Sequence, residues 1–364
     1  MAEDRNRIAG DYVSAFIRDG PQAYIANLET SVDLYRWGGH VLPMTINDGG
    51  HVGTFVCSPR IGLIDYTREE LARFPNRAIV PLLRTIVDSA GAVLSLANMN
   101  RVVHVNNWMM STNLPVDIDP GLAGSQTDSL VARFPDHLLA IRSLTTRHSA
   151  ELIDALKSAG WMLLPSRQIY LVDDVESQLM KRRDARRDER IWQDGSYVYE
   201  ELEGVSEADA ERIAELYRLL YLEKYSYLNP VYTARFVSMT QEIGLIRYLV
   251  LRDGEGTIQG FGGMHRFGRH ATMPLIGYNT AVAQEHGLYR LTFHAGSRYA
   301  ARNSLAFNMS SGAAAFKLNR GGTPEMEFTA YYFRHLPLQR RMPFGFLRMI
   351  ADKVGVPILR RYQL

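Results

Sequence analysis

The sequence predicts an α/β protein made of two lobes in tandem, each a mixed, twisted sheet flanked by helices. Three observations support this fold class. A chain of 364 residues is longer than one hydrophobic core comfortably fills. Apolar segments that alternate like strands recur between segments with the apolar spacing of amphipathic helices. Finally, the first part of the chain is expected to end with a strand, a helix and a strand, and the same order is expected again in the second part.

Residues 1–175 are expected to form the first lobe. Its clearest unit is a strand at 137–144, a helix at 149–160 and a strand at 161–172, and this helix ends at a glycine, as a C-cap requires. A helix of this length can cross one face of a sheet. The preceding part of the lobe is expected to contain helices at 1–25 and 67–89 and strand-rich stretches at 34–59 and 92–110.

Residues 176–196 are expected to form a charged linker between the lobes. The segment 181–190, KRRDARRDER, holds six basic and three acidic residues. One interpretation is a connecting helix whose mixed charges face solvent. The alternative is a basic surface for a phosphate-rich partner such as tRNA.

Residues 197–364 are expected to form the second lobe and a C-terminal helical tail. After a first strand come two helices, and Ser206 is placed to cap the first of them. Three antiparallel strands, a helix, a strand, a short helix and a last strand follow. These elements are expected at 197–203, 206–225, 233–243, 245–253, 256–268, 271–283, 287–303, 305–311, 313–319 and 325–333.

Composition and missing motifs exclude several classes of protein. The formal net charge of +2 does not suit a protein that coats polyanions. The single cysteine, Cys57, allows no intrachain disulfide or thiolate metal site, and the ten histidines match no metal-binding spacing, so no metal is expected. A charged N-terminus and the absence of an apolar run of roughly 18 residues predict a cytoplasmic protein without a membrane partner.

Three sites in the second lobe carry a resemblance. Gln284-Glu285-His286-Gly287-Leu288-Tyr289 lies between an expected strand and helix, and Ala313-Ala314-Ala315-Phe316-Lys317 precedes Arg320-Gly321. The strand 305–311 stands between them. Over residues 197–335 this arrangement resembles the GNAT acyltransferase superfamily. The two-lobed length, and Phe316-Lys317 ending at a glycine pair, are also similar to the Fem-type aminoacyl-tRNA-dependent transferases.

The resemblance implies an acyl-coenzyme A donor and a site for its pyrophosphate. Gly287 precedes a helix, and the unpaired first N–H groups of a helix attract anions. Tyr289 stands where the family has Gly or Ala, so its side chain must turn away from the donor. The expected donor-binding residues are Gln284, His286, Gly287, Leu288, Tyr289, Arg290 and Lys317.

The same resemblance suggests where catalysis and acceptor binding take place. Asn308 and Ser310 would face the reacting carbonyl, Glu223 or Glu327 would take the proton of the attacking amine, and Tyr278 would reprotonate the leaving group. The expected acceptor-binding residues are Tyr225, Asn229, His265, Ser311 and Tyr331.

The sequence therefore predicts an N-acyltransferase that moves an acyl group to an amine, or related nitrogen, of a small molecule by direct attack. Acyl-coenzyme A is the favoured donor. A Fem-type aminoacyltransferase that uses aminoacyl-tRNA is the alternative. A second alternative is a non-catalytic binding module, which predicts that Phe307 and Tyr289 plug the cleft between the strands.

Overall fold

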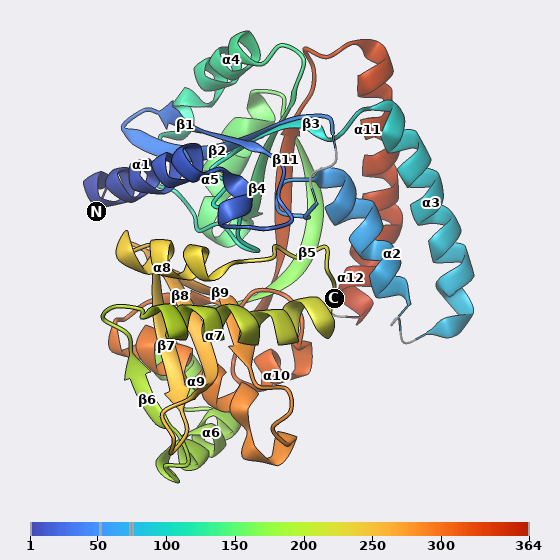
Figure 1. Cartoon of the computed structure of the whole chain (residues 1–364). Helices are drawn as coiled ribbons and strands as arrows, with labels where there is room; N and C mark the ends of the chain where they lie inside the picture. The colour runs from blue at the N-terminus through green and yellow to red at the C-terminus, as the bar shows by residue number, and fades with distance from the viewer. Residues whose placement is uncertain (1, 51–52, 73, 75, 363–364) are drawn as a thin grey trace.

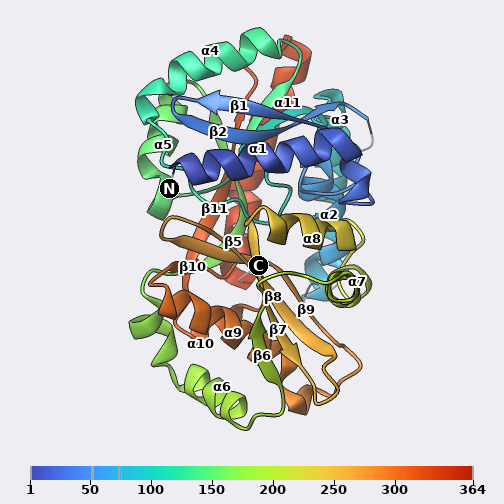
Figure 2. The same cartoon turned by 60° about the vertical axis from the view of Figure 1, so that its left-hand side comes forward.

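The computed structural model describes residues 2–50, 53–72, 74 and 76–362. One sheet of eleven strands runs the length of the molecule in the order β1-β2-β3-β4-β11-β5-β10-β9-β8-β7-β6 (Figures 1 and 2). The strands are β1 (Ser31–Trp37), β2 (His40–Asp48), β3 (Arg101–Val105), β4 (Leu138–Thr145), β5 (Met162–Val172), β6 (Val198–Glu201), β7 (Ile246–Arg252), β8 (Ile258–Phe267), β9 (His270–Tyr278), β10 (Ala306–Asn308) and β11 (Thr323–Tyr332).

Helices cover both faces of this sheet because neighbouring residues of a strand point to opposite faces. In β3, Val103 and Val105 pack with α4 and α5, whereas Val102 packs with α3 and α11. The helices are α1 (Ala2–Asp19), α2 (Tyr66–Leu71), α3 (Val80–Leu96), α4 (Ala123–Arg133), α5 (Thr146–Ser158), α6 (Arg183–Gln193), α7 (Glu207–Tyr217), α8 (Ala234–Glu242), α9 (Leu288–Arg302), α10 (Ala314–Asn319), α11 (Leu338–Ile350) and α12 (Val356–Tyr362).

The two halves of the chain exchange strands at the centre of the sheet. β11 was expected to close the second lobe, but it lies between β4 and β5 of the first half and is antiparallel to both. In turn, β5 pairs with β10 of the second half. The prediction of a strand here was right and its expected position was wrong, because the pairing partners of a strand are set by contacts distant in sequence. The lobe boundaries at 175 and 197 stay predictions.

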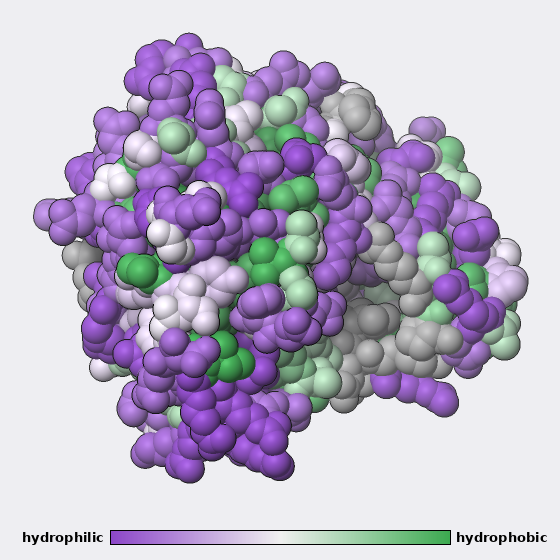
Figure 3. All heavy atoms as spheres, turned by 60° about the horizontal axis from the view of Figure 1, so that its bottom comes forward, coloured by the Kyte–Doolittle hydropathy of each residue, from purple (hydrophilic) through white to green (hydrophobic). Residues whose placement is uncertain are grey.

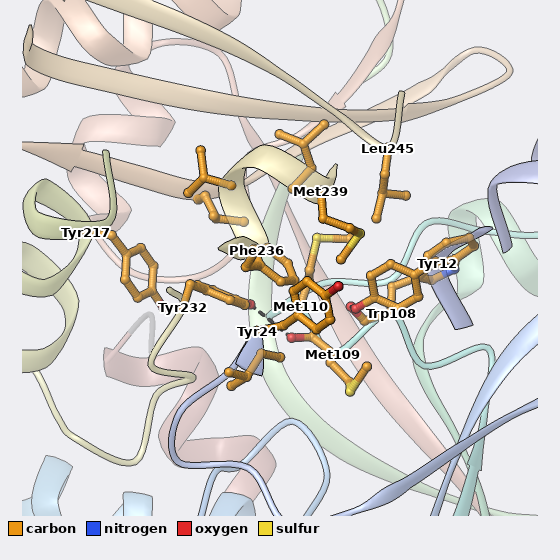
Figure 4. Packing of buried hydrophobic residues seen from close by; sticks show 14 of the residues in the cluster. Tyr12, Tyr24, Trp108, Met109, Met110, Tyr217, Tyr232, Phe236, Met239 and Leu245 are labelled. Atoms are coloured by element: carbon orange, nitrogen blue, oxygen red, sulfur yellow. Dashed lines mark hydrogen bonds between the residues drawn. The ribbon is translucent and has the colours of Figure 1, made fainter. Parts of the chain in front are cut away.

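A shared hydrophobic core also joins the halves (Figure 4). Tyr12 on α1 donates a hydrogen bond to the carbonyl of Trp108 at 2.7 Å, and Tyr232 donates one to the carbonyl of Met109 at 2.9 Å. Phe236 of α8 stacks on Tyr232 with ring centroids 4.3 Å apart. The loop that follows β3 is therefore held by both halves, and it is one wall of the site described below.

Two further expectations need correction. The segment 92–110 was expected to be a strand, but α3 extends to Leu96 and β3 covers only Arg101–Val105. Its short apolar run suits either structure, and packing against the sheet decides for a helix. Residues 53–59 form no strand after β2, and 51–52 lie outside the described residues.

The continuous helical segment Arg77–Leu96 is also long and apolar enough, by length and composition, to cross a membrane, and 22% of its most apolar window is buried in the protein. The expectation that no segment has this character therefore does not hold. In the structure, α3 packs against α2 and α11 on one face of the sheet (Figure 1).

Candidate active site at the junction of the two halves

An arginine–glutamate pair lies at the centre of the sheet. The antiparallel register of β5 and β11 places Glu327 directly opposite Arg167. Arg167 donates from Nε to Oε1 at 2.9 Å and from Nη2 to Oε2 at 3.2 Å. The Glu327 side chain is 5% exposed and that of Arg167 is 20% exposed. This two-pronged geometry is the strong form of a charged hydrogen bond, and it fixes the guanidinium in one orientation.

The Arg167 guanidinium also ties together segments that are distant in sequence. Its Nη2 donates to the carbonyl of Ser111 at 2.7 Å and to Oγ1 of Thr112 at 2.8 Å, both in the loop after β3. Its Nη1 lies 3.5 Å from Oγ of Ser311, in the segment after β10. One side chain thus positions parts of both halves around the same point.

A second arginine, Arg142 on β4, holds the opposite side of that loop. Its Nη1 donates to the carbonyl of Val56 at 3.0 Å and to Oδ1 of Asn107 at 3.1 Å. Its Nη2 donates to the carbonyl of Ser111 at 3.4 Å. Burial lowers the pKa of the Arg142 guanidinium. The negative charge of the Glu327 carboxylate offsets part of this shift.

Lys317 points into this region from α10. It is 4% exposed, and its Nζ donates to the carbonyl of Ser311 at 2.6 Å and to that of Ser310 at 3.1 Å. Burial, with a smaller contribution from Arg167, lowers the pKa of the Lys317 ammonium to about 7. We call Arg142, Arg167, Lys317, Glu327, Ser310 and Ser311 the central cluster. Its three cationic side chains face one carboxylate, which makes the site electropositive.

The central cluster lies where two parallel strands separate. β10 pairs with β9 only from Ala306 opposite His270 to Asn308 opposite Thr272, whereas β9 continues to Tyr278. The chain then turns away through Ser310 at φ 59°, a left-handed conformation. Oδ1 of Asn308 stabilises this turn by accepting a hydrogen bond from the Ser310 N–H at 2.8 Å. We call the place where the two strands diverge, between β9 and the segment 309–313, the wedge.

Aromatic side chains line the wedge on the side of α9. The ring of Tyr289 lies 6.0 Å from that of Tyr278 and 4.9 Å from that of Phe316. Tyr221 packs against the same core as Tyr278 and Tyr289, and burial raises the pKa of its phenol. Phe307, in contrast, is fully buried against Phe293 in the core behind β10.

The start of α9 forms the outer end of the wedge. Gln284–His286 is a short 3-10 helix with exposed side chains, and Gly287, at φ 65°, redirects the chain into α9 at Leu288. Leu288 itself is buried in the core. Arg290 does not face this end, because its Nε donates to the buried carboxylate of Asp188 on α6 at 2.6 Å.

Several predicted site residues lie outside the central cluster. Glu223 is exposed and pairs with Arg218, and Tyr225 is exposed beside Tyr221, 5.9 Å between ring centroids. The others are buried and bonded locally. Asn229 donates to the carbonyls of Tyr221 and Ser226, and Nδ1 of His265 bonds the Leu245 carbonyl while burial lowers the pKa of this histidine to about 3. Tyr331 packs against Phe344.

The predicted residues that the structure does bring together are Lys317, Ser310, Ser311 and Glu327, with Asn308 and Tyr278 at the wedge. Arg142 and Arg167, which connect them, were not predicted. Their signal was a single arginine within an otherwise apolar strand, at 137–144 and again at 161–172. A charge in a buried strand is costly unless it is paired, so such an arginine indicates a partner elsewhere in the chain.

The part of the chain that the structure describes contains no group of three or more His, Cys, Asp or Glu side chains that could hold a metal. Cys57 is buried, and burial raises the pKa of its thiol to about 11, so at neutral pH it is a neutral thiol.

No protein-family model and no curated protein sequence matches this chain. Among solved structures, FemX shares the fold of this chain, and two others resemble it more loosely. FemX superposes with a TM-score of 0.50 at 8% identity, over 63% of this chain and 81% of FemX. L-PGS from Bacillus licheniformis gives 0.47 at 13% identity, over 69% and 82%. A GCN5-related N-acetyltransferase from Kribbella flavida gives 0.36 at 11% identity, over 64% and 81%.

The predicted fold class is thus confirmed: the chain is a mixed α/β protein whose fold is GNAT-like and similar to that of Fem-type transferases. The central cluster and the wedge together are the candidate functional site of this chain.

Proposed function

We propose that this protein transfers an acyl group from an activated donor to a nitrogen nucleophile of a small molecule, at the junction of its two halves. The proposal rests on the buried position of Lys317. This lysine is buried at the open end of β10, and two backbone carbonyls hold its Nζ beside Arg167. A buried lysine with a strongly shifted pKa, beside a second cation, is a candidate for a functional group.

Lys317 can stabilise the negative charge that acyl transfer creates. Its ammonium has three N–H donors, and the carbonyls of Ser310 and Ser311 accept two of them. The third is available for the carbonyl oxygen of the donor as this oxygen becomes an oxyanion. Losing one such donor typically slows a reaction by about 10²–10³-fold. Arg167 adds positive charge at the same place.

The proposed reaction needs no covalent intermediate with the protein. The nitrogen lone pair attacks the acyl carbon, a C–N bond forms, and the bond from the acyl carbon to the sulfur or oxygen of the donor breaks. That sulfur or oxygen leaves with the electron pair and takes up the proton that the nitrogen loses. Holding both substrates in line supplies much of the rate in such a mechanism.

We favour acyl-coenzyme A as the donor. We place the acyl chain of the donor where β9 and the segment 309–313 diverge, with its carbonyl toward Lys317. At its outer end, the first N–H groups of α9 lack partners within the helix and suit a pyrophosphate, as do the exposed side chains of Gln284 and His286. Arg290 is not part of this donor site, because Asp188 holds it.

An aminoacyl-tRNA is the second candidate donor, and α6 favours it. The side of α6 that faces the protein carries Ala185 and Asp188, which are buried. The arginines of this helix are exposed on the other side, which is therefore strongly basic. Figure 3 shows this end of the molecule, where the surface is mostly hydrophilic. The exposed cations of this face, from Lys181 to the end of the helix, are Lys181, Arg182, Arg183, Arg186, Arg187 and Arg190.

The function is tested by replacing Lys317 with Met and, separately, with Arg. Acyl transfer from acetyl-coenzyme A and from charged tRNA to a panel of small amines is measured, together with donor affinity by calorimetry. We expect Lys317→Met to lose about hundredfold or more in rate with donor affinity nearly kept, and Lys317→Arg to keep part of the activity. Lys157→Met, at an exposed position of α5, is the matched control. A fully active Lys317→Met would refute the proposal.

The donor is tested at the two anion surfaces. Gly287→Asp places a negative charge at the start of α9, and Gly287→Asn has the same shape and tolerates the same φ without the charge. If the donor is acyl-coenzyme A, its binding is lost in the Asp variant only. If the donor is charged tRNA, neutralising Arg182, Arg183 and Arg186 weakens its retention and reduces its salt dependence.

A further inference from the structure

The outer layer formed by α3 and α11 exposes an unusual amount of apolar surface. Ten large apolar side chains of the described residues are markedly exposed, and six of them lie on these two helices. Exposed apolar residues that occur singly need no explanation, whereas a cluster of them indicates an interaction site. The six are Leu82, Leu96, Leu338, Met342, Phe346 and Met349.

The exposed residues of α11 form a continuous stripe. Leu338, Met342, Phe346 and Met349 follow one another at spacings of four, four and three residues, which places them on one side of a helix. They are 65%, 68%, 36% and 46% exposed. The opposite side of α11 is buried through Phe344. α11 is therefore apolar on two sides, and the described protein covers only one of them.

α3 lies beside α11 and faces the same way. Both helices pack on the same face of the sheet, around Val102 and Leu138, so their outward sides point in the same direction. Figure 1 shows them side by side at one edge of the molecule, and they are in contact. Leu82 and Leu96, 63% and 72% exposed, lie on the outward side of α3.

Cationic side chains flank this apolar surface. Arg84 on α3 and Arg341, Arg348 and Lys353 on and just after α11 are exposed. Two acidic residues nearby are paired: Asp88 accepts a hydrogen bond from Arg68 at 2.7 Å, and Asp352 lies 3.6 Å from Arg348, one of these cations. A helix with an apolar stripe and basic flanks is typical of proteins that lie in the surface of an anionic bilayer.

We infer that the outward face of α3 and α11 binds peripherally to anionic membrane surfaces. The helices lie in the plane of the interface and do not cross it, because α3 buries Leu83, Ala90 and Leu94 in the protein and carries Arg84 and Asp88. A second copy of the chain is a poorer occupant, since a two-fold contact would bring the same cations of both copies together. This inference is independent of the transfer reaction.

The test is co-sedimentation of the full-length protein with vesicles of phosphatidylcholine and phosphatidylglycerol, and with vesicles of phosphatidylcholine alone. We expect binding to the anionic vesicles that weakens as salt rises. Met342→Glu with Phe346→Glu should lower the partition coefficient by more than about tenfold, because two apolar anchors are lost and two negative charges are added. Arg341→Gln with Arg348→Gln should weaken binding to anionic vesicles only.

The matched control is Ile17→Glu with Val198→Glu, which changes two exposed apolar residues on other surfaces, 66% and 64% exposed, and should leave vesicle binding unchanged. Sedimentation velocity of each variant shows whether it remains folded and whether it self-associates. Failure of the unmodified protein to bind anionic vesicles would overturn the inference, as would equal binding of the Met342 and Phe346 variant. A dimer that this variant abolishes would instead identify the face as a contact between copies.

Discussion

At the residue scale, the structure depends on a few buried charges that compensate one another. Arg167 and Glu327 are 160 positions apart in the chain and directly opposite each other in the sheet. Ion pairs of this kind contribute little net stability when intact, because desolvation offsets their attraction. Removing one partner is costly, because the other charge is left buried and uncompensated.

This pair gives the first stability prediction. Arg167→Met leaves the Glu327 carboxylate buried without its charge partner and should lower the free energy of unfolding by about 3–5 kcal/mol. Arg167→Met combined with Glu327→Gln should recover a large part of that loss. Urea unfolding measures all three proteins. Lys157→Met, which breaks an exposed pair with Asp154, is the control and should cost less than about 1 kcal/mol. If Arg167→Met proved as stable as the control, Glu327 would not depend on Arg167 as its buried charge partner.

At the scale of elements, α6 is bound to the second half by a buried carboxylate. Asp188 is 1% exposed and accepts from Arg290 at 2.6 Å and from Nη2 of Arg320 at 2.6 Å, so it links α6 to α9 and to the end of α10. Arg320 also stacks on Phe316 at 3.5 Å, beside the wedge. The charged segment expected as a linker is therefore a helix with one structural side and one basic side.

We expect Asp188→Asn to destabilise the protein by at least about 2 kcal/mol, because two guanidinium groups lose their common anion. Asp154→Asn is the control at an exposed position of α5, where the carboxylate is 76% exposed and lies 3.2 Å from Lys157. This control should change stability by less than about 1 kcal/mol. Thermal unfolding of both variants at equal ionic strength measures the difference. Equal losses in the two variants would contradict the structural role given to Asp188.

Local pattern was enough to predict most elements and part of the site. Ser206 caps α7 as predicted, and its Oγ accepts from the Asp209 N–H at 3.1 Å. The helix start at Gly287 follows from a segment that can be read within a few residues. The position of β11 and the role of Arg167 could not be predicted, because both depend on pairing between strands that lie far apart in sequence.

At the scale of the whole molecule, the exchange of strands makes each half incomplete without the other. A chain of residues 1–175 lacks β11, which fills the space between β4 and β5, and a chain of 176–364 lacks β5, the neighbour of β10. Open strand edges and exposed core surface favour aggregation. Two lobes built in this way are expected to unfold together.

We therefore predict one cooperative unfolding transition for the full chain and no stable fold for either half alone. Circular dichroism and size-exclusion chromatography of the fragments 1–175 and 176–364 test this, and the two fragments produced together are the control. The joint sample should recover more native structure than either fragment, because β5 and β11 can then pair. A monomeric fragment that unfolds cooperatively alone would contradict the shared sheet.

The central claim is that the Lys317 ammonium stabilises the oxyanion of an acyl transfer. The most direct measurement is the rate of transfer as a function of pH for the unmodified protein and for Lys317→Arg, whose guanidinium keeps its charge. Burial lowers the pKa of Lys317 to about 7, so the ammonium is present below that pH and is lost above it. Dividing one rate by the other removes the titration of the attacking amine, which both proteins share. Our account predicts that the rate of the unmodified protein relative to the arginine variant falls as pH rises through about 7. A ratio that stays constant, or one that rises with pH, would contradict it.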